Sequence, residues 1–293
     1  MIRMLNKNRE LQTRRMGTKV IHRINYKINM FLRVVLSSVL VAILIFLFIV
    51  AVIGLSAFFQ LSWLMSLLYY LQPDALVNFH DCQYNAVGLT FDDAPSSSTN
   101  NMLDTLYRHD ASATFFMLGN KLENYINDTV LSPTLEKLLK NGNEVGNHMY
   151  NQDASFQLTR NLFNKQFFKT HGYIERLKLW RNNKYKWFRP GSFFPTNQMY
   201  DIVGKLGYTL VMGNTHSFDF QIRKTQYNLF ALTGRIKSGD IIICHDLKDN
   251  LDYVEEMLIY LEMKGFKVIT LSKMMETCVP NNKLHFQGDF ALH

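Results

Sequence analysis

The chain has 293 residues, of which 47% are hydrophobic and 19% charged, so it is long enough and apolar enough to bury a sizeable core. Its formal net charge is +8, and residues 1–33 alone carry nine Lys or Arg side chains against one Glu, so residues 34–293 balance at zero. The basic excess is therefore confined to one segment and gives no indication of a nucleic-acid-binding surface.

A long apolar stretch follows the basic segment. No charged side chain occurs from Val34 to Pro73, and residues 39–53 are apolar without interruption. Because about 20 such residues span the hydrocarbon core of a bilayer, residues 34–57 are predicted to form a single transmembrane anchor. A cleaved signal peptide is the nearest alternative, although its apolar region is usually only about 7–15 residues long.

The basic segment also predicts the orientation of this anchor. Lys and Arg beside a span stay on the cytoplasmic side, so residues 1–33 are expected in the cytoplasm and the rest outside it, in a secretory lumen or at the cell surface. Residues 58–80 form a juxtamembrane linker, whose apolar part is too short for an easy second span. A tight two-span hairpin, which would reverse the topology, is the alternative.

Short apolar runs and helix-like segments alternate beyond residue 80. Such alternation predicts one α/β domain, at residues 81–277, with a largely parallel sheet or barrel. We expect strands at 86–91, 113–118, 144–146, 187–189, 209–212, 240–244 and 267–270, and helices near 102–109, 133–141, 161–178, 198–206, 227–237 and 251–264.

Polar and titratable residues follow several of these strands. Two adjacent carboxylates, Asp92 and Asp93, end the first strand, and such a pair usually has a cation or a strong donor beside it. The same pair could instead open the next helix as an N-cap. Because the carboxyl ends of parallel strands meet in space, a catalytic site is predicted from the residues found there. They are Asp92, Asp93, His148, Arg189, the segment around Asp219, and His245.

Five ordered stretches resemble the motifs of the polysaccharide deacetylase family, the NodB homology domain. The family's Thr-Phe-Asp-Asp-Gly-Pro motif appears as Thr90-Phe-Asp-Asp-Ala-Pro95, and its Arg-Pro motif follows Phe188. The resemblance implies an irregular (β/α) barrel that removes N-acetyl groups from a glycan. In chain order, the five stretches lie at residues 90–95, 146–152, 188–194, 216–220 and 239–246.

The resemblance also implies a role for each matching residue. Asp93 and His148 would bind a divalent metal, most often zinc, with cobalt or manganese as alternatives. Asp92 would act as the general base on a water molecule, and His245 would act as the general acid that protonates the departing amine. Two further residues would orient these groups, namely Arg189 for Asp92 and Asp219 for His245. Asp246 is expected to serve only as a strand-end cap.

One departure from the family pattern bears on the metal. The family has a second histidine four residues after the first, and this chain has Gln152 there. A neutral amide oxygen is a poorer zinc ligand than imidazole. Three outcomes stay open: Gln152 or Asp153 completes the ligand set, a looser site operates, or the metal is lost and the protein is a pseudoenzyme that binds glycan.

Lesser departures and aromatic residues concern the substrate. Alanine replaces the glycine of the first motif at position 94, Gly191 and Ser192 alter the third motif, and Phe220 replaces a tryptophan of the fourth. Aromatic side chains near the motifs are expected to flank the sugar. The candidates are Tyr150, Trp187, Phe193 and Phe194.

Three cysteines agree with an oxidising compartment. Cys82 precedes the first domain strand and Cys278 follows the last helix, so a disulfide between them would join the two ends of the domain. Three free thiols are the alternative, and Cys244 is expected to be a small buried hydrophobic residue. The Asn127-Asp-Thr129 sequon predicts glycosylation if the domain is outside the cytosol. Residues 278–293 carry no motif.

Overall fold

The computed structural model describes residues 2–58, 70, 74–80, 82–126, 132–192 and 194–279. The chain divides into two units, Met1–Leu61 and Ser62–His293, which are described separately. The predicted glycosylation sequon at 127–129, the candidate substrate residue Phe193, most of the linker's apolar part and the segment 280–293 lie outside the described residues.

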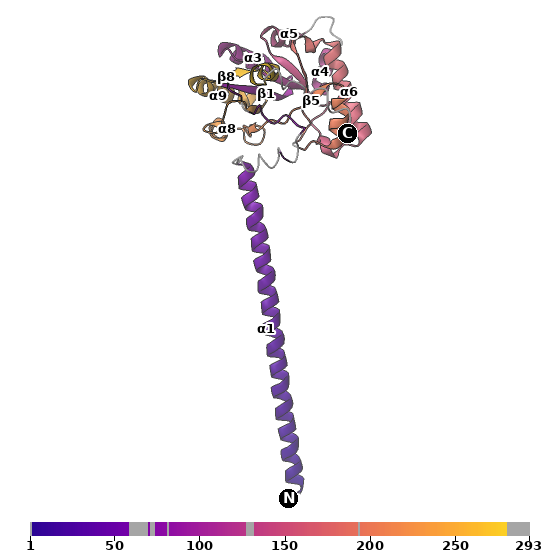
Figure 1. Ribbon diagram of the computed structural model, residues 1–293. Coiled ribbons are helices and arrows are strands. Elements are labelled where there is room, and N and C mark those ends of the chain that lie inside the picture. Colours follow the sequence, from indigo (N-terminus) through magenta and orange to yellow (C-terminus); the bar gives the residue numbers. More distant parts are fainter. Residues whose placement is uncertain are drawn as a thin grey trace. The chain divides into compact units, whose positions relative to one another are not determined.

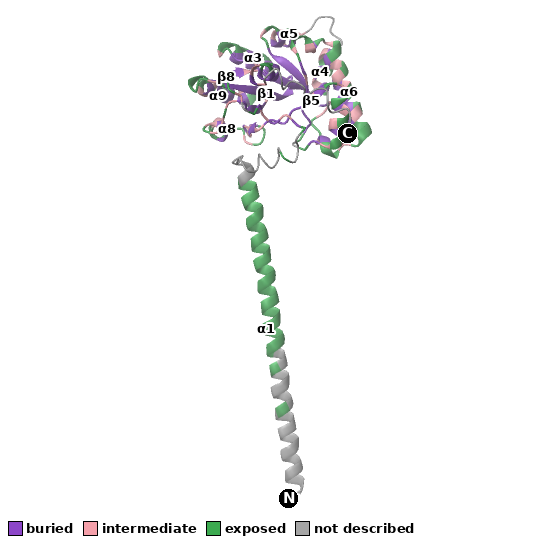
Figure 2. Ribbon diagram, viewed as in Figure 1, coloured by how far each residue is buried: buried purple, intermediate pink, exposed green. Residues whose placement is uncertain are grey.

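The first unit is a single helix, α1 (Ile2–Phe58). Its segment Tyr26–Leu55 is long enough and apolar enough to cross a membrane, and none of that window is buried by the protein. Large apolar side chains such as Leu36 and Phe48 are exposed at 67% and 69%. Figure 2 shows this part of the helix as exposed. A surface of this kind is stable in lipid, because exposing each such side chain to water costs about 1.5–3 kcal/mol.

The second unit contains an eight-stranded sheet, and every described ladder in it is parallel. The strand order is β5-β4-β3-β2-β1-β7-β6, with β8 paired to β1. This parallel, curved arrangement with surrounding helices is the irregular (β/α) barrel expected from the sequence (Figure 1). The strands are β1 (Ala86–Ala94), β2 (Thr114–Met117), β3 (Glu144–Asn147), β4 (Lys186–Phe188), β5 (Tyr208–Leu210), β6 (Thr215–His216), β7 (Ile241–His245) and β8 (Lys267–Ile269).

Alternate residues of the strands belong to different parts of the core. In β1, Val87, Leu89 and Phe91 pack in the largest apolar cluster, together with residues of the surrounding helices. Ala86, of the opposite parity, packs in a separate cluster with Trp187 of β4. This period of two is expected for strands buried on both faces, and all nine residues of β1 are buried.

Helices connect the strands and cover the sheet. Their apolar faces supply much of the burial; α9, for example, buries Val254, Met257 and Leu261. Figures 1 and 2 show the buried strands with helices around them. The helices are α3 (Thr99–Arg108), α4 (Gly119–Leu122), α5 (Pro133–Lys140), α6 (Arg160–Arg176), α7 (Asn197–Gly204), α8 (Thr225–Leu232), α9 (Leu251–Met263) and α10 (Leu271–Cys278), with single-turn 3₁₀ helices at Glu123–Tyr125, Ser155–Gln157, Leu179–Asn182 and Lys248–Asn250.

The structure differs from the sequence-based expectation in a few short elements. β1 continues through both carboxylates to Ala94, because Phe91 and Asp92 remain paired with β7 and Ala94 pairs with Met117 of β2 after a register shift. The strand β6 and the helices α4 and α10 were not predicted. β6 has two residues and α4 has four, lengths too short for a hydrophobic period to be read.

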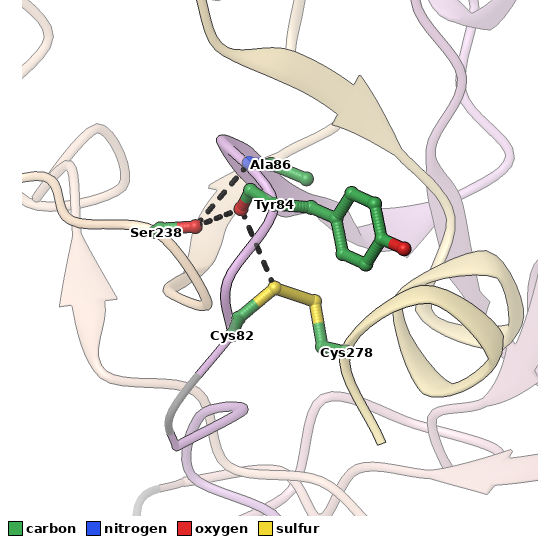
Figure 3. Close-up of a disulfide and its surroundings, with 5 residues drawn as sticks. All are labelled: Cys82, Tyr84, Ala86, Ser238 and Cys278. Atoms are coloured by element: carbon green, nitrogen blue, oxygen red, sulfur yellow. Dashed lines mark hydrogen bonds between the residues drawn. A yellow bond between two sulfur atoms is a disulfide. The ribbon is translucent and has the colours of Figure 1, made fainter. Parts of the chain in front are cut away.

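A disulfide joins Cys82, just before β1, to Cys278 at the end of α10, as the sequence led us to expect. Figure 3 shows the surrounding contacts: Ser238 Oγ donates to the carbonyl of Tyr84 and accepts from the Ala86 amide. The bridge therefore fastens the end of the last helix to the segment that enters the central strand. The remaining cysteine, Cys244, is a buried free thiol.

A buried glutamate lies at the other end of the sheet from the motif residues. Glu144, at the start of β3, is 1% exposed. Its Oε1 accepts from Thr114 Oγ1 (2.8 Å), Trp187 Nε1 (3.0 Å) and the Ser272 amide (2.9 Å). Burial raises the pKa of the carboxyl, although these hydrogen bonds act in the opposite direction. The carboxylate thus accepts hydrogen bonds from β2, β4 and α10, although its burial makes the charged form less stable.

Glu144→Gln is expected to become more stable relative to wild type as pH rises. A raised pKa in the folded state means that stability is fully present below the unfolded value near 4.5 and is lost as pH rises through the folded value. For one proton the slope is at most about 1.4 kcal/mol per pH unit. Urea unfolding of both chains from pH 4.5 to 8 measures the difference. Glu256→Gln, at an exposed position, is the control, and parallel curves for Glu144→Gln and wild type would contradict the prediction.

Candidate active site

The carboxyl ends of the strands carry unusual backbone conformations. Four non-glycine residues there have positive φ: Asp93 (62°), Met149 (69°), Ser192 (69°) and Phe218 (57°). They lie at or just after the ends of β1, β3, β4 and β6. Such conformations are uncommon for residues with a side chain and occur often at functional sites. The sharp turns place the residues beside them at one end of the sheet.

The proposed base, Asp92, is paired with an arginine. Arg189 Nη1 donates to Asp92 Oδ1 at 2.7 Å, and the two residues are only 4% and 6% exposed. Burial raises the pKa of Asp92, but the charges of Arg189, His148 and His245 outweigh it and keep that pKa below its usual value. Asp92 is therefore ionised at neutral pH.

Arg189 is itself held in place by several contacts. Its Nη1 also donates to Thr90 Oγ1 at 2.8 Å, and its Nε donates to the carbonyl of Val211 at 3.3 Å. The guanidinium lies over the ring of Phe116, 4.2 Å from the centroid. These contacts restrain the arginine, so its position beside Asp92 agrees with the orienting role that the resemblance implies.

His148 faces the two carboxylates. Its Nδ1 is 2.8 Å from the carbonyl of Arg189, an acceptor, so Nδ1 carries a proton and Nε2 is the nitrogen that faces the carboxylates. Nε2 lies 3.7 Å from Asp93 Oδ1 and 3.9 Å from Asp92 Oδ2. A histidine whose other nitrogen donates to a carbonyl is the usual arrangement for a metal ligand.

The geometry fits two protein ligands for a divalent ion. Two donors of one tetrahedral zinc lie roughly 3.4 Å apart, close to the 3.7 Å between His148 and Asp93. The sequence offers two candidates for a third ligand, Gln152 and Asp153. Gln152 and Asp153 are exposed, and Asp153 Oδ2 accepts from Gln166 Nε2 at 2.7 Å. Within the described ranges, no three His, Cys, Asp or Glu side chains cluster as a metal site.

His245, at the end of β7, forms a second pair. Its Nδ1 lies 2.8 Å from Asp219 Oδ1, and its amide donates to Asp219 Oδ2 at 2.7 Å. Burial lowers the pKa of the imidazole, but the hydrogen bond and charge of Asp219, with the charges of Asp92 and Asp93, raise it overall. A histidine with a raised pKa carries a proton over a wider pH range, as a general acid requires.

Asn250 supports this pair and was missed by sequence reasoning. Its Nδ2 donates to Asp219 Oδ2 at 2.6 Å and to the carbonyl of His245 at 2.9 Å, and the side chain is 1% exposed. Asparagine before a helix usually reads as an N-cap, so the sequence offered no separate signal. In the structure it fixes the carboxylate that orients the histidine.

Asp246 makes the cap expected of it, beside the site. The side chain is fully buried and accepts from Ser96 N (3.0 Å), Ser96 Oγ (2.9 Å) and Thr99 Oγ1. Burial raises its pKa, against the effect of these bonds. The carboxylate connects the end of β7 to the start of α3 and so fastens the turn that follows Asp93.

The prediction that Trp187 contacts substrate is wrong. Its side chain is fully buried inside the sheet, where Nε1 donates to Glu144. Trp187 shares a face with Arg189 but lies two residues earlier, inside β4, whereas Arg189 follows the end of the strand where the site begins.

The other aromatic candidates have more accessible positions. Tyr150 is partly exposed, but its hydroxyl donates to Glu123 and Lys169 Nζ lies 4.0 Å from its ring centroid. Phe194 is 58% exposed and stacks edge-on with Phe156. Phe220, which occupies the position of the family's tryptophan, has its ring 5.2 Å from that of His245.

Known proteins resemble this chain over the same region. The sequence profile of the family described as polysaccharide deacetylase matches residues 81–211. Peptidoglycan-N-acetylmuramic acid deacetylase PdaC of Bacillus subtilis is 27% identical over 67% of this chain and 40% of its own length. Peptidoglycan-N-acetylglucosamine deacetylase PgdA of Listeria monocytogenes is 27% identical over 68% and 41%. The chain thus spans less than half the length of these two relatives.

Solved structures agree with these sequence matches. The structure of PdaC from Bacillus subtilis superposes with a TM-score of 0.58 at 26% identity, covering 67% of this chain and 93% of that one. BA3943 of Bacillus anthracis, named a family 4 pseudoenzyme, superposes with a TM-score of 0.59 over 68% of each chain, and at 24% identity this likeness concerns the fold alone. With the motif residues gathered at one end of a parallel barrel, these matches identify residues 81–211 as a polysaccharide deacetylase domain of the NodB type.

Proposed function

We propose that the protein is a metal-dependent hydrolase that removes N-acetyl groups from an N-acetylated glycan. One observation carries the proposal: two buried acid–base pairs, Asp92–Arg189 and His245–Asp219, stand at the strand ends that also hold Asp93 and His148. A protein that only bound glycan would have little use for both pairs. The named activities of PdaC and PgdA support a glycan of the peptidoglycan type, and a chitin-type polymer presents the same acetamido group.

In the proposed reaction, Asp92 removes a proton from the water that attacks the acetyl carbonyl, and Arg189 keeps its carboxylate in position. His245 gives a proton to the departing amine, while Asp219 fixes the imidazole and stabilises its charged form. A divalent ion held by Asp93 and His148, zinc or alternatively cobalt or manganese, would polarise the carbonyl and acidify the water. Because its pKa is below the usual value, Asp92 is a weak base. It therefore removes a proton more readily from a water molecule whose own pKa the ion has lowered.

A glycan-binding pseudoenzyme is the second candidate. The observation in its favour is Gln152, which stands where the family has a metal histidine, together with the exposure of both Gln152 and Asp153. Without a third protein ligand, an ion would depend on water for the rest of its coordination shell. A site of that kind binds more weakly than one with three protein ligands.

The proposed location follows from α1 and the disulfide. Residues 34–57 would anchor the chain in a membrane, with residues 1–33 in the cytoplasm and the deacetylase domain outside it. The disulfide between Cys82 and Cys278 is of the kind that persists in oxidising compartments.

Acetate release by the full chain in detergent micelles tests the proposal. The chain is purified, its metal content measured, and acetate release assayed on N-acetylglucosamine oligomers and on peptidoglycan fragments, before and after chelation and re-addition of zinc, cobalt or manganese. We expect release that chelation abolishes and one of the ions restores. A chain that binds these glycans but releases no acetate with any ion supports the pseudoenzyme instead.

A further inference from the structure

Each of the last three residues of β1, Asp92 to Ala94, has a hydrogen-bonded carbonyl oxygen. The carbonyls of Asp92 and Ala94 accept from main-chain amides, at 2.9 and 2.8 Å. Between them, the carbonyl of Asp93 accepts from Lys121 Nζ at 2.5 Å. Lys121 thus supplies the one donor of the three that comes from a side chain. The two amides belong to Asp246 and Leu118.

The middle carbonyl belongs to a residue in a left-handed conformation. Asp93 has φ of 62° and is 4% exposed. Such a backbone is unfavourable for a residue with a side chain. In this conformation the carbonyl of Asp93 meets Lys121 while its carboxylate lies 3.7 Å from His148 Nε2. A hydrogen bond from a charged donor is stronger than one from a neutral donor, and it acts against the backbone cost of this conformation.

Lys121 is placed for this contact by its element. It lies in α4, the short helix directly after β2, and is partly buried. Among the described residues its ammonium forms no ion pair at contact distance, unlike Lys137, which pairs with Asp104 at 2.7 Å. Its charge also acts on the buried carboxyl of Asp246, whose pKa it lowers against the larger effect of burial. Lys121 therefore acts on two residues of the site region: its ammonium donates to the carbonyl of Asp93, and its charge acts on the carboxyl of Asp246.

We propose that Lys121 is a positioning residue for Asp93: its bond to the Asp93 carbonyl holds the left-handed backbone and so aims the carboxylate at the position facing His148. The part of this inference that concerns a metal ion rests on the proposed function. The part that concerns the backbone does not. No step of the proposed reaction requires Lys121 to touch the substrate.

The test compares Lys121→Met and Lys121→Arg with wild type and with Lys137→Met, all as the full chain in detergent. Lys137 is a matched control because its Nζ also donates to a main-chain carbonyl, that of Asn100, at 3.3 Å. Two quantities are measured: hydrogen exchange of the peptide that covers residues 86–99, and the dissociation constant for zinc or cobalt by calorimetry.

Lys121→Met is expected to exchange the amides at the end of β1 about 10-fold faster and to bind the ion about 10- to 100-fold more weakly. Lys121→Arg keeps a charged donor and should recover most of both effects, whereas Lys137→Met should change neither. Should Lys121→Met fail to fold, Lys121→Gln takes its place.

Wild-type exchange in the Lys121→Met chain would overturn the proposal whether or not an ion binds. Faster exchange with unchanged ion affinity would overturn the claim that the lysine serves the Asp93–His148 pair. A wild-type chain that binds no ion and releases no acetate defeats the proposed function, and the exchange comparison then decides the role of Lys121 by itself.

Discussion

Asp92→Asn is expected to lower kcat for acetate release by about 10²- to 10⁴-fold, the usual effect of losing a general base. Asparagine has the size of aspartate but cannot take up a proton. Ion binding should persist, because Asp93 and His148 are unchanged. Acetate release and ion affinity, measured on the same full-chain preparation, check the prediction.

The substitution also alters a buried ion pair, so stability has to be measured beside activity. Removing one partner of such a pair can destabilise a fold by about 3–5 kcal/mol, although an amide oxygen can still accept from Arg189. Asp240→Asn is the control, because Asp240 is 5% exposed and borders the opposite end of β7. It should lose stability without losing kcat. Full activity in folded Asp92→Asn would eliminate Asp92 as the base.

Opening the disulfide is expected to lower the free energy of unfolding by about 2–5 kcal/mol. The two cysteines are 196 residues apart, and the loop-entropy model puts a bridge of that length near the upper end of the range. The measurement is a urea titration of wild type and of the double variant Cys82→Ser, Cys278→Ser, each with and without a reductant.

The reductant serves as an internal control for this experiment. It should lower the midpoint for wild type to that of the double variant and leave the double variant unchanged. Cys244, which is buried and not bridged, stays in both chains. If thiol counting showed the bridge open in wild type while the midpoint stayed the same, the bridge would contribute nothing to stability.

The architecture was largely readable from sequence because its strands are unbroken apolar runs. β7, with four consecutive buried residues Ile241 to Cys244, is an example. Elements that are defined only by pairing with a neighbouring strand could not be predicted from the sequence. β6 exists because Thr215 and His216 lie beside Ile242 and Ile243, and two residues carry no period. The same holds for the continuation of β1 through its carboxylates.

Within the site, residues at the ends of strands were predictable and residues that reach it from elsewhere were not. Asp92 and Arg189 follow the strand-end rule, and the family resemblance supplied their roles. Asn250 and Lys121 act through hydrogen bonds that depend on how distant segments fold together. In sequence they look like an ordinary helix cap and an ordinary helical lysine. The prediction for Trp187 was wrong for a related reason, since its place inside β4, two residues before Arg189, puts the side chain in the core and not at the strand end.

The length of α1 has a consequence for its charges. At 1.5 Å per residue, its 57 residues rise about 85 Å, and the part before Tyr26 alone accounts for about 36 Å. Electrostatic attraction to anionic headgroups fades over about 8 Å at physiological salt. With Tyr26–Leu55 in a bilayer, the exposed Arg23 would lie within one such length of the membrane boundary, because it precedes Tyr26 by about 4.5 Å of helix.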